Sequence, residues 1–220
     1  QDLREELLAA GHVFTTHTDS ETLLHGYEEW GKELVHKLRG MYAFVIWDRE
    51  KQELFGARDI FGIKPFYYAQ MNDSFLFGSE IKSFLEHPKF DKVFNEDLLG
   101  VYLSFQFVPT NETFFKGVKR IEPGYQLVYK EGKIELDRFF KLEFTEELKD
   151  TDKAAKEIAA AMEDSVKRNF DTDVPMGSLL SSGVDSSYIV SIAKPEKTFT
   201  VGYDNQKYNE STYAKDLADK

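Results

Sequence analysis

The sequence predicts an α+β domain with a four-layer αββα arrangement, followed by an incomplete α/β domain built on a parallel sheet. Helical spacing of apolar residues over residues 21–37 gives way to short β-rich runs between residues 41 and 77, which favours helices packed on antiparallel sheets. From residue 177 a strand, a glycine-containing loop, a helix and a second strand follow in order, as in a parallel sheet. We expect domains over residues 1–142 and 153–220, joined by a charged linker at residues 143–152.

The first domain begins with helical patterns. Residues 1–10 fit part of an amphipathic helix, and the next helix starts behind a cap-like Thr18-Asp19-Ser20 cluster. The β-rich runs that follow cover residues 41–47, 54–57, 65–68 and 75–77, with polar turns between them. Residues 41–47 are apolar at nearly every position, which predicts a strand buried on both faces and hence two stacked sheets with helices outside.

Further elements complete both domains. In the first, we expect helices over residues 80–87 and 95–105, the latter behind the candidate cap Asn95, and a strand over residues 124–129. In the second, we expect a helix with a shared apolar face, a strand at 177–180, a helix at about 185–193, a strand at 198–203 and a last helix.

Composition narrows the function classes. A net charge of −11 repels a phosphate backbone and disfavours general nucleic-acid binding. No stretch approaches the roughly 20 apolar residues that span a bilayer, so a cytoplasmic protein without a membrane role is expected. Cysteine is absent, which removes thiolate metal sites and cysteine nucleophiles from these residues. The chain starts at Gln1 and stops at Lys220 inside helical patterns, so we expect both ends to be cut.

The segment Leu180-Ser181-Ser182-Gly183-Val184-Asp185-Ser186 lies between a predicted buried strand and a helix. Unpaired N–H groups at a helix start and small side chains suit an anion, and the serine hydroxyls can donate hydrogen bonds. The lysine of a Walker-type loop is missing, which implies a different nucleotide chemistry. The alternative is a serine-rich helix cap without a ligand.

This segment resembles the pyrophosphate loop of ATP pyrophosphatases, whose pattern is Ser-Gly-Gly-x-Asp-Ser. Ser182 stands where that family usually has its first glycine, which raises the question of an unusual backbone conformation there. The Val201-Gly202 pair resembles the end of the family's second strand, and the resemblance implies that the backbones of Leu180 and Val201 contact adenine. Without the resemblance, Val201 is an ordinary core valine. Mg²⁺ is the expected companion of the phosphates.

Residues 1–90 resemble the glutaminase domain of N-terminal-nucleophile amidotransferases, through the segments at residues 18–22, 39–44, 57–68 and 78–82. The resemblance implies that Asp19 binds the α-ammonium of glutamine; the alternative is that Asp19 caps a helix starting at Ser20. Arg58 and Asp59 flank a glycine turn and are interpreted as a turn-stabilising ion pair. The five histidines show no metal-ligand spacing, and no metal site is predicted.

Residues 105–124 resemble the region that connects the two domains of asparagine synthetases. The combined resemblance is to glutamine-dependent asparagine synthetases, and it implies that glutamine, aspartate and ATP yield asparagine through β-aspartyl-AMP. It also implies a catalytic N-terminal cysteine upstream of Gln1, so that no catalytic residue of the glutaminase lies in this chain, and a possible homodimer. A β-lactam synthetase, another carboxylate-adenylating amidotransferase and a non-catalytic paralogue remain as alternatives.

Overall fold

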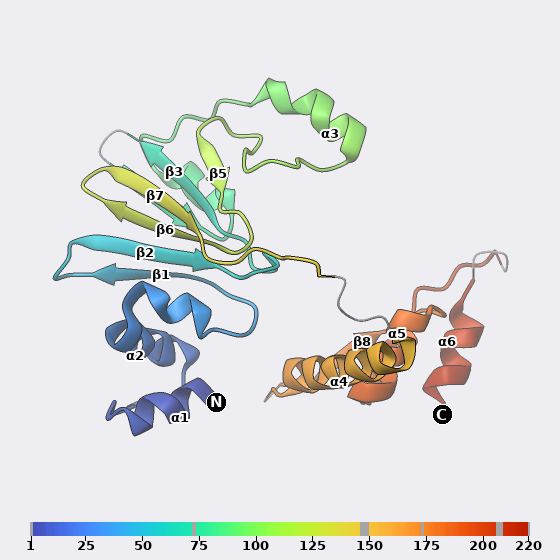
Figure 1. The fold of residues 1–220 in the computed structure, drawn as a ribbon. Coiled ribbons are helices and arrows are strands. Elements are labelled where there is room, and N and C mark those ends of the chain that lie inside the picture. Colours follow the sequence, from blue (N-terminus) through green and yellow to red (C-terminus); the bar gives the residue numbers. More distant parts are fainter. Residues whose placement is uncertain (1, 72–73, 146–149, 173, 206–208, 220) are drawn as a thin grey trace. The chain divides into compact units, whose positions relative to one another are not determined.

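The computed structural model describes residues 2–71, 74–145, 150–172, 174–205 and 209–219 (Figure 1). Contacts within the chain divide it into two compact units, Gln1–Glu143 and Phe144–Lys220, here called unit 1 and unit 2. Each unit is described by itself. No described helix in either unit combines the length and the hydropathy that crossing a membrane requires.

Unit 1 contains two antiparallel sheets. The first has the strand order β1 (Ala43–Asp48), β2 (Glu53–Arg58), β6 (Tyr125–Lys130) and β7 (Lys133–Arg138). The second has the order β4 (Ser74–Gly78), β3 (Tyr67–Met71) and β5 (Val118–Arg120). All five pairings are antiparallel, which confirms the prediction for this domain.

Successive side chains of β2 point to opposite faces of the first sheet, so β2 packs against the helices on one face and against the second sheet on the other. Phe55 points to the helical side and packs with Tyr27 and Leu34, whereas Leu54 points to the second sheet and packs with Phe66. The whole of β2 is buried. The sequence predicted this burial for residues 41–47 instead; β1 does pack on both faces, but it is the edge strand of its sheet and only Ile46 is fully buried.

Helices cover the outer face of the first sheet. They are α1 (Asp2–Ala9), α2 (Asp19–Trp30) and the 3-10 helix η1 (Gly31–His36), and Figure 1 shows α2 lying against β1 and β2. The single helix predicted over residues 21–37 is therefore two elements. Gly31 separates them, because its φ of 59° is unfavourable for other residues and its N–H caps α2 at the carbonyl of Tyr27.

Short helices cover the other sheet. The 3-10 helix η2 (Ile81–Glu86) places Phe84 on Ala69 and Val118, so the fourth predicted layer exists in 3-10 form. The 3-10 helix η3 (Glu96–Leu98) and α3 (Leu99–Phe105) follow. Asn95 is the N-cap residue of η3, as predicted, but its side chain makes no capping hydrogen bond; its amide donates to the carbonyl of Thr113 at 3.3 Å.

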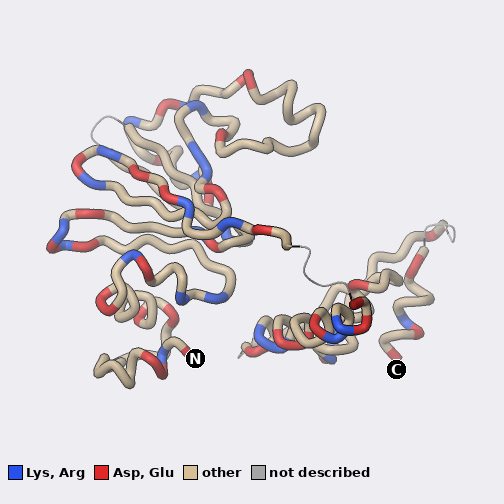
Figure 2. Tube along the Cα trace, in the orientation of Figure 1, with Lys and Arg blue, Asp and Glu red and all other residues tan. Residues whose placement is uncertain are grey.

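Unit 2 contains α4 (Thr151–Phe170), β8 (Gly177–Leu179), α5 (Val184–Ala193), β9 (Lys197–Phe199) and α6 (Ser211–Ala218). Asp150 caps α4 by accepting the N–H groups of Asp152 and Lys153, and charges of both signs alternate along the helix (Figure 2). Strands β8 and β9 pair in parallel, which confirms the predicted connectivity of this region. Both strands end earlier than predicted, so residues 180 and 200–203 form loops.

Candidate functional site

The loop between β8 and α5 is anchored to the end of β9. The N–H of Leu180 donates to the carbonyl of Phe199 at 2.9 Å, and the hydroxyl of Thr200 donates to the carbonyl of Leu180 at 2.7 Å. The side chain of Leu180 is buried, with 2% of the residue exposed. These contacts place residues 181–186 and 200–202 at the same end of two parallel strands, which is where open α/β sheets bind ligands.

Serine hydroxyl groups hold the loop in shape. Oγ of Ser181 and Oγ of Ser186 lie 2.8 Å apart, and Oγ of Ser186 also accepts the N–H of Ser181 at 3.2 Å. Ser181 Oγ accepts the N–H of Gly183 at 3.2 Å, and the Ser187 hydroxyl donates to the carbonyl of Gly183 at 2.7 Å. The loop is thus preorganised by its own side chains.

The start of α5 keeps hydrogen-bonding capacity for a ligand. Gly183 is the N-cap, and no side chain caps the helix. The N–H groups of Val184, Asp185 and Ser186 find no acceptor among the described residues. A serine-rich cap would have used these donors, so the capping alternative does not describe this loop.

A carboxylate already contacts the loop. Oε2 of Glu210 accepts the N–H of Ser182 at 3.3 Å, which shows that this side of the loop can bind an anionic oxygen. Asp185 is exposed, and its side chain has no hydrogen bond or ion pair with a described residue. Glu210 lies just before α6 and was not predicted as a site residue, since nothing in the sequence links it to a loop 28 positions away.

Two questions raised by the sequence have structural answers. Ser182 is not among the described residues with positive φ, so a serine fits where the ATP pyrophosphatases have glycine. Val201 is 71% exposed and is therefore not a core valine in this structure. Gly202 lies beside it, in the loop that follows β9.

Asp19 is the first residue of α2 and is exposed. The N-cap is Thr18, whose Oγ1 accepts the N–H of Glu21 at 3.4 Å, so the alternative in which Asp19 caps the helix was wrong. The Asp19 carboxylate has no partner among the described residues and is available to a ligand. Its role in binding glutamine stays a prediction.

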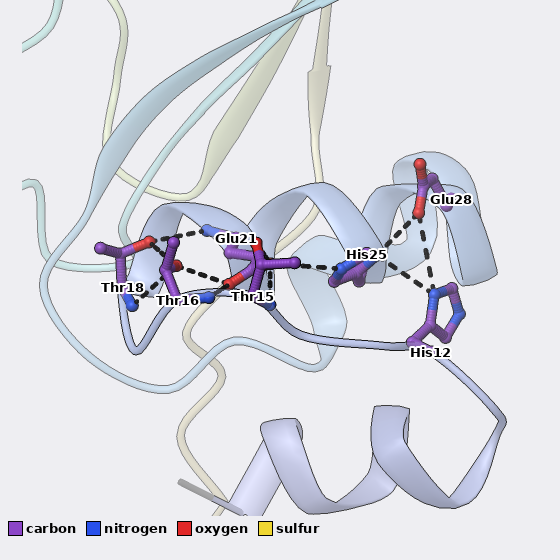
Figure 3. A network of polar contacts seen from close by, with 7 residues as sticks. All are labelled: His12, Thr15, Thr16, Thr18, Glu21, His25 and Glu28. Atoms are coloured by element: carbon purple, nitrogen blue, oxygen red, sulfur yellow. Dashed lines mark hydrogen bonds and ion pairs between the residues drawn. The ribbon is translucent and has the colours of Figure 1, made fainter.

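The Glu21 side chain holds residues 15 and 16, which precede Asp19, against α2 through hydrogen bonds. Its carboxylate accepts the N–H groups of Thr15 at 2.7 Å and Thr16 at 2.6 Å, and both threonine hydroxyls donate to it as well (Figure 3). The N–H of Thr15, followed by the hydroxyl of Thr16, lowers the pKa of Glu21 to about 2. The Thr18-x-x-Glu21 spacing is a capping-box pattern, and it could have predicted part of this arrangement from the sequence.

Arg58 and Asp59 stabilise a turn, although not as an ion pair. Arg58 donates to the carbonyls of Gly62, Lys64 and Ile121 at 2.6 to 2.7 Å, and burial lowers its pKa. Asp59, 1% exposed, accepts backbone N–H groups within the same turn. Every contact is to the backbone, so the residues serve structure, as expected, by a different bonding pattern.

Two histidines that are distant in sequence meet in the structure. His12 and His25 lie side by side with Glu28 (Figure 3), an arrangement that the sequence spacing did not predict. His36, by contrast, lies 3.7 Å from Glu33, three residues before it, and packs on Phe139, with no second histidine beside it among the described residues.

Comparison with known proteins identifies both units. The family described as "Glutamine amidotransferase domain" matches residues 1–140, and the family described as "Asparagine synthase" matches residues 157–220. Asparagine synthetase (glutamine-hydrolyzing) 1 of Bacillus subtilis (strain 168) is 45% identical over 99% of this chain and 35% of its own length. Asparagine synthetase (glutamine-hydrolyzing) 3 of the same organism is 37% identical over 94% of this chain and 36% of its own length. The chain therefore spans about a third of these relatives.

Among solved structures, the glutamine phosphoribosylpyrophosphate amidotransferase from B. subtilis, complexed with ADP and GMP, aligns with a TM-score of 0.44 at 18% sequence identity. The alignment covers 93% of this chain and 44% of that one.

Proposed function

Because this chain belongs to the glutamine-hydrolysing asparagine synthetases, we propose that the whole protein makes asparagine from aspartate and ATP with ammonia released from glutamine. Unit 1 is assigned to the glutaminase and unit 2 to the synthetase, with the boundary in residues 143–152. The aspartate carboxylate is adenylated to β-aspartyl-AMP with release of pyrophosphate, and ammonia then displaces AMP. Adenylation is needed because a free carboxylate has no adequate leaving group for attack by a neutral amine.

The observation that carries the synthetase half is the loop at the start of α5. The N–H groups of Val184, Asp185 and Ser186 are without acceptors among the described residues and are suited to phosphate oxygens. The Ser182 hydroxyl, which has no hydrogen-bond partner among the described residues, adds a donor at the same loop, whereas the Ser181 and Ser186 hydroxyls bond to each other and to carbonyls of the loop. We assign the pyrophosphate end of ATP to this loop.

The neighbouring chain segments account for the rest of the nucleotide. The backbones of Leu180 and Val201 are assigned to adenine and Gly202 to close approach of the nucleotide, since Leu180 is anchored to β9 and Val201 is exposed beside it. The carboxylate of Asp185, which has no partner among the described residues, suits Mg²⁺, which prefers oxygen ligands and accompanies the phosphates. When bound, Mg²⁺ would offset phosphate charge.

Asp19 is assigned to the substrate of the glutaminase half. A carboxylate that neither caps its helix nor pairs with a described residue can bind the α-ammonium group of glutamine. Glu21 holds residues 15 and 16 against α2 and so fixes the approach to Asp19. The nucleophile of this half is assigned to a cysteine outside these residues, which contain none. A cytoplasmic homodimer completes the proposal.

The test is asparagine formation by the whole protein from aspartate and ATP, with AMP measured as the co-product. Glutamine and ammonia are supplied in separate reactions. We expect asparagine and AMP in equal amounts with either donor. Activity with ammonia alone would remove the glutaminase half of the proposal, and no AMP with either donor would overturn the synthetase half in favour of a different activated carboxylate or a non-catalytic protein.

A further inference from the structure

Three side chains in unit 1 direct their donor atoms at a common point. Nδ1 of His12 lies 3.2 Å from Nδ1 of His25, which in turn lies 2.8 Å from Oε2 of Glu28. The third side of this triangle, from His12 Nδ1 to Glu28 Oε2, is 3.7 Å. His12 lies in the segment after α1, whereas His25 and Glu28 are one turn apart on α2 (Figure 3).

The hydrogen-bonding roles of these atoms favour a shared cation. Oε2 of Glu29 lies 3.0 Å from Nε2 of His12, and a carboxylate only accepts, so the proton of a neutral His12 lies on Nε2 and its Nδ1 presents a lone pair. Glu28 presents a lone pair as well. With His12 neutral, one proton, on Nδ1 of His25, serves the three converging atoms, and a second cation at the triangle, either a proton or a metal ion, would complete their bonding.

The spacing of the three atoms matches a metal site. Zinc lies about 2.0–2.2 Å from imidazole nitrogen and carboxylate oxygen, so neighbouring ligands of a tetrahedral site are roughly 3.3 Å apart. The observed separations of 2.8, 3.2 and 3.7 Å lie on both sides of that value. The donor atoms thus already form one face of a zinc tetrahedron.

Both imidazole rings also have an acidic partner on the side away from the triangle. Glu29 accepts from His12 Nε2 at 3.0 Å, whereas Oε1 of Glu21, 3.9 Å from His25 Nε2, is beyond hydrogen-bond distance and acts only as a nearby charge. Carboxylates that contact the outer nitrogen of a metal-binding histidine fix its tautomer and orientation. Glu21 is itself held by the N–H groups of Thr15 and Thr16, so this partner has a fixed position.

We propose that His12, His25 and Glu28 bind one zinc-type divalent metal ion, with a water molecule in the fourth position. Two imidazoles select such ions over Mg²⁺ and Ca²⁺, which prefer oxygen ligands. The side chains of His12 and His25 are 16% and 20% exposed, whereas Glu28 is 63% exposed, so the ion would be reached from the Glu28 side. Because His12 precedes Asp19 in the sequence and His25 follows it, the bound ion would link the two ends of the segment that contains Asp19.

The exposed His36 and Glu33 provide an internal control. They have the same three-residue spacing as His25 and Glu28, and Nε2 of His36 lies 3.7 Å from Oε2 of Glu33. No second imidazole is found beside them among the described residues. A difference between the two pairs therefore reports the effect of His12.

Calorimetric titration of the chain with Zn²⁺ tests the proposal, and Co²⁺ titration followed by visible absorption reports the coordination geometry. We expect one ion per chain, reversal by a chelator and the absorption of a tetrahedral Co²⁺ site. His12→Gln and His25→Gln should each weaken binding by at least about 100-fold, and Glu29→Gln by about 10-fold, in the range measured for outer-sphere partners. His36→Gln should leave the affinity unchanged.

Circular dichroism of each variant checks that the fold is kept. If His25→Gln does not fold, Glu28→Gln at the exposed ligand replaces it, and loss of binding in that folded variant supports the site. Absence of a saturable Zn²⁺ site in the unmodified chain would overturn the proposal. Equal affinities of the unmodified chain, His12→Gln and Glu28→Gln would do so too.

Discussion

The turn at residues 58–64 and the loop at residues 181–186 look alike in sequence, but they differ in whether their polar groups already have hydrogen-bond partners. Each places an aspartate near a glycine after a strand. In the turn, Asp59 is buried and both of its carboxylate oxygens accept backbone N–H groups. In the loop, Asp185 is exposed and has no partner among the described residues.

The same contrast holds for the charged and polar groups around the two aspartates. Arg58 directs all three guanidinium nitrogens at backbone carbonyls, which leaves it little capacity for a ligand. At the start of α5, the backbone N–H groups of residues 184–186 are open in the described structure. An account of donors and acceptors therefore separates an aspartate with a structural role from one whose carboxylate stays accessible to a ligand, where residue type and spacing do not.

The largest effect is expected for Arg58→Ala, which leaves three carbonyl groups of the turn without their donor. We expect unit 1 to lose about 3 kcal/mol of unfolding free energy, since hydrogen bonds to charged groups are strong and the site is buried. Urea unfolding measures the change. Arg49→Ala, at an exposed position in the preceding turn, between β1 and β2, is the control, and equal midpoints for the two variants would contradict the structural role.

Asp185→Ala tests the other side of the comparison. In the whole protein we expect at least about a 100-fold loss of asparagine formation with either nitrogen donor, equivalent to about 2.7 kcal/mol, with little change in unfolding free energy. Steady-state rates and thermal unfolding are measured on the same samples. A folded variant that loses glutamine hydrolysis and synthesis equally would defeat the assignment to the nucleotide site.

Asp19→Ala extends the comparison to another aspartate whose carboxylate has no partner among the described residues. We expect about a 10-fold higher KM for glutamine, because a charge-assisted contact to the α-ammonium group is lost, and an unchanged rate with ammonia. Ser20→Ala, beside it in the same exposed helix start, serves as the matched variant. A rate that falls with ammonia as the donor would count against a role confined to glutamine.

Two tyrosine hydroxyls of unit 1 give the smallest effects, with opposite signs. The Tyr27 hydroxyl donates to Asp48 at 3.2 Å and contacts Glu53 at 3.4 Å, whereas the buried Tyr42 hydroxyl has no hydrogen-bond partner among the described residues. Tyr27→Phe should cost about 1 kcal/mol, and Tyr42→Phe should be neutral or stabilise by up to about 1 kcal/mol. Thermal unfolding of the two variants at pH 7 compares them; a larger loss for Tyr42→Phe would reverse the interpretation.

The pH dependence of the unfolding free energy gives a second test of the Tyr42 hydroxyl. Burial, followed by the charge of Asp59, raises the pKa of Tyr42 to about 12. A raised pKa favours the neutral phenol in the folded state, so this contribution to stability is complete below pH 10 and is lost as the pH rises toward 12. Tyr42→Phe should therefore lose less stability than the unmodified chain between pH 10 and 12. Parallel stability curves would show that the hydroxyl is not in a buried site.

Much of the fold could be predicted from the sequence because the spacing of apolar residues along a segment indicates which of its side chains are buried. Strands with apolar runs were found, whereas β7 was missed because charged residues occupy half or more of it (Figure 2) and β5 because it is only three residues long. The break between α2 and η1 was missed although Gly31 marks it. Tertiary pairing, rather than local preference, forms these elements.

The same limit applies to the candidate sites: contiguous residues could be singled out from the sequence, whereas contacts between distant residues could not. The loop at residues 181–186 could be singled out because its residues are contiguous, and Asp19 was singled out through the resemblance of residues 1–90 to glutaminase domains; the binding roles of both stay predictions. The contact of Glu210 with Ser182 and the meeting of His12 with His25 join residues 28 and 13 positions apart. No period or motif encodes such contacts, so only the folded chain reveals them.

Aspartate-dependent exchange of labelled pyrophosphate into ATP tests the central assignment most directly, because it needs the nucleotide site and neither nitrogen donor. The account predicts exchange by the whole protein that requires aspartate and Mg²⁺, that falls at least about 100-fold in Asp185→Ala, and that is kept in Asp19→Ala. Exchange that is absent from the unmodified protein, or that survives intact in Asp185→Ala, would contradict the assignment of ATP to the loop at residues 181–186.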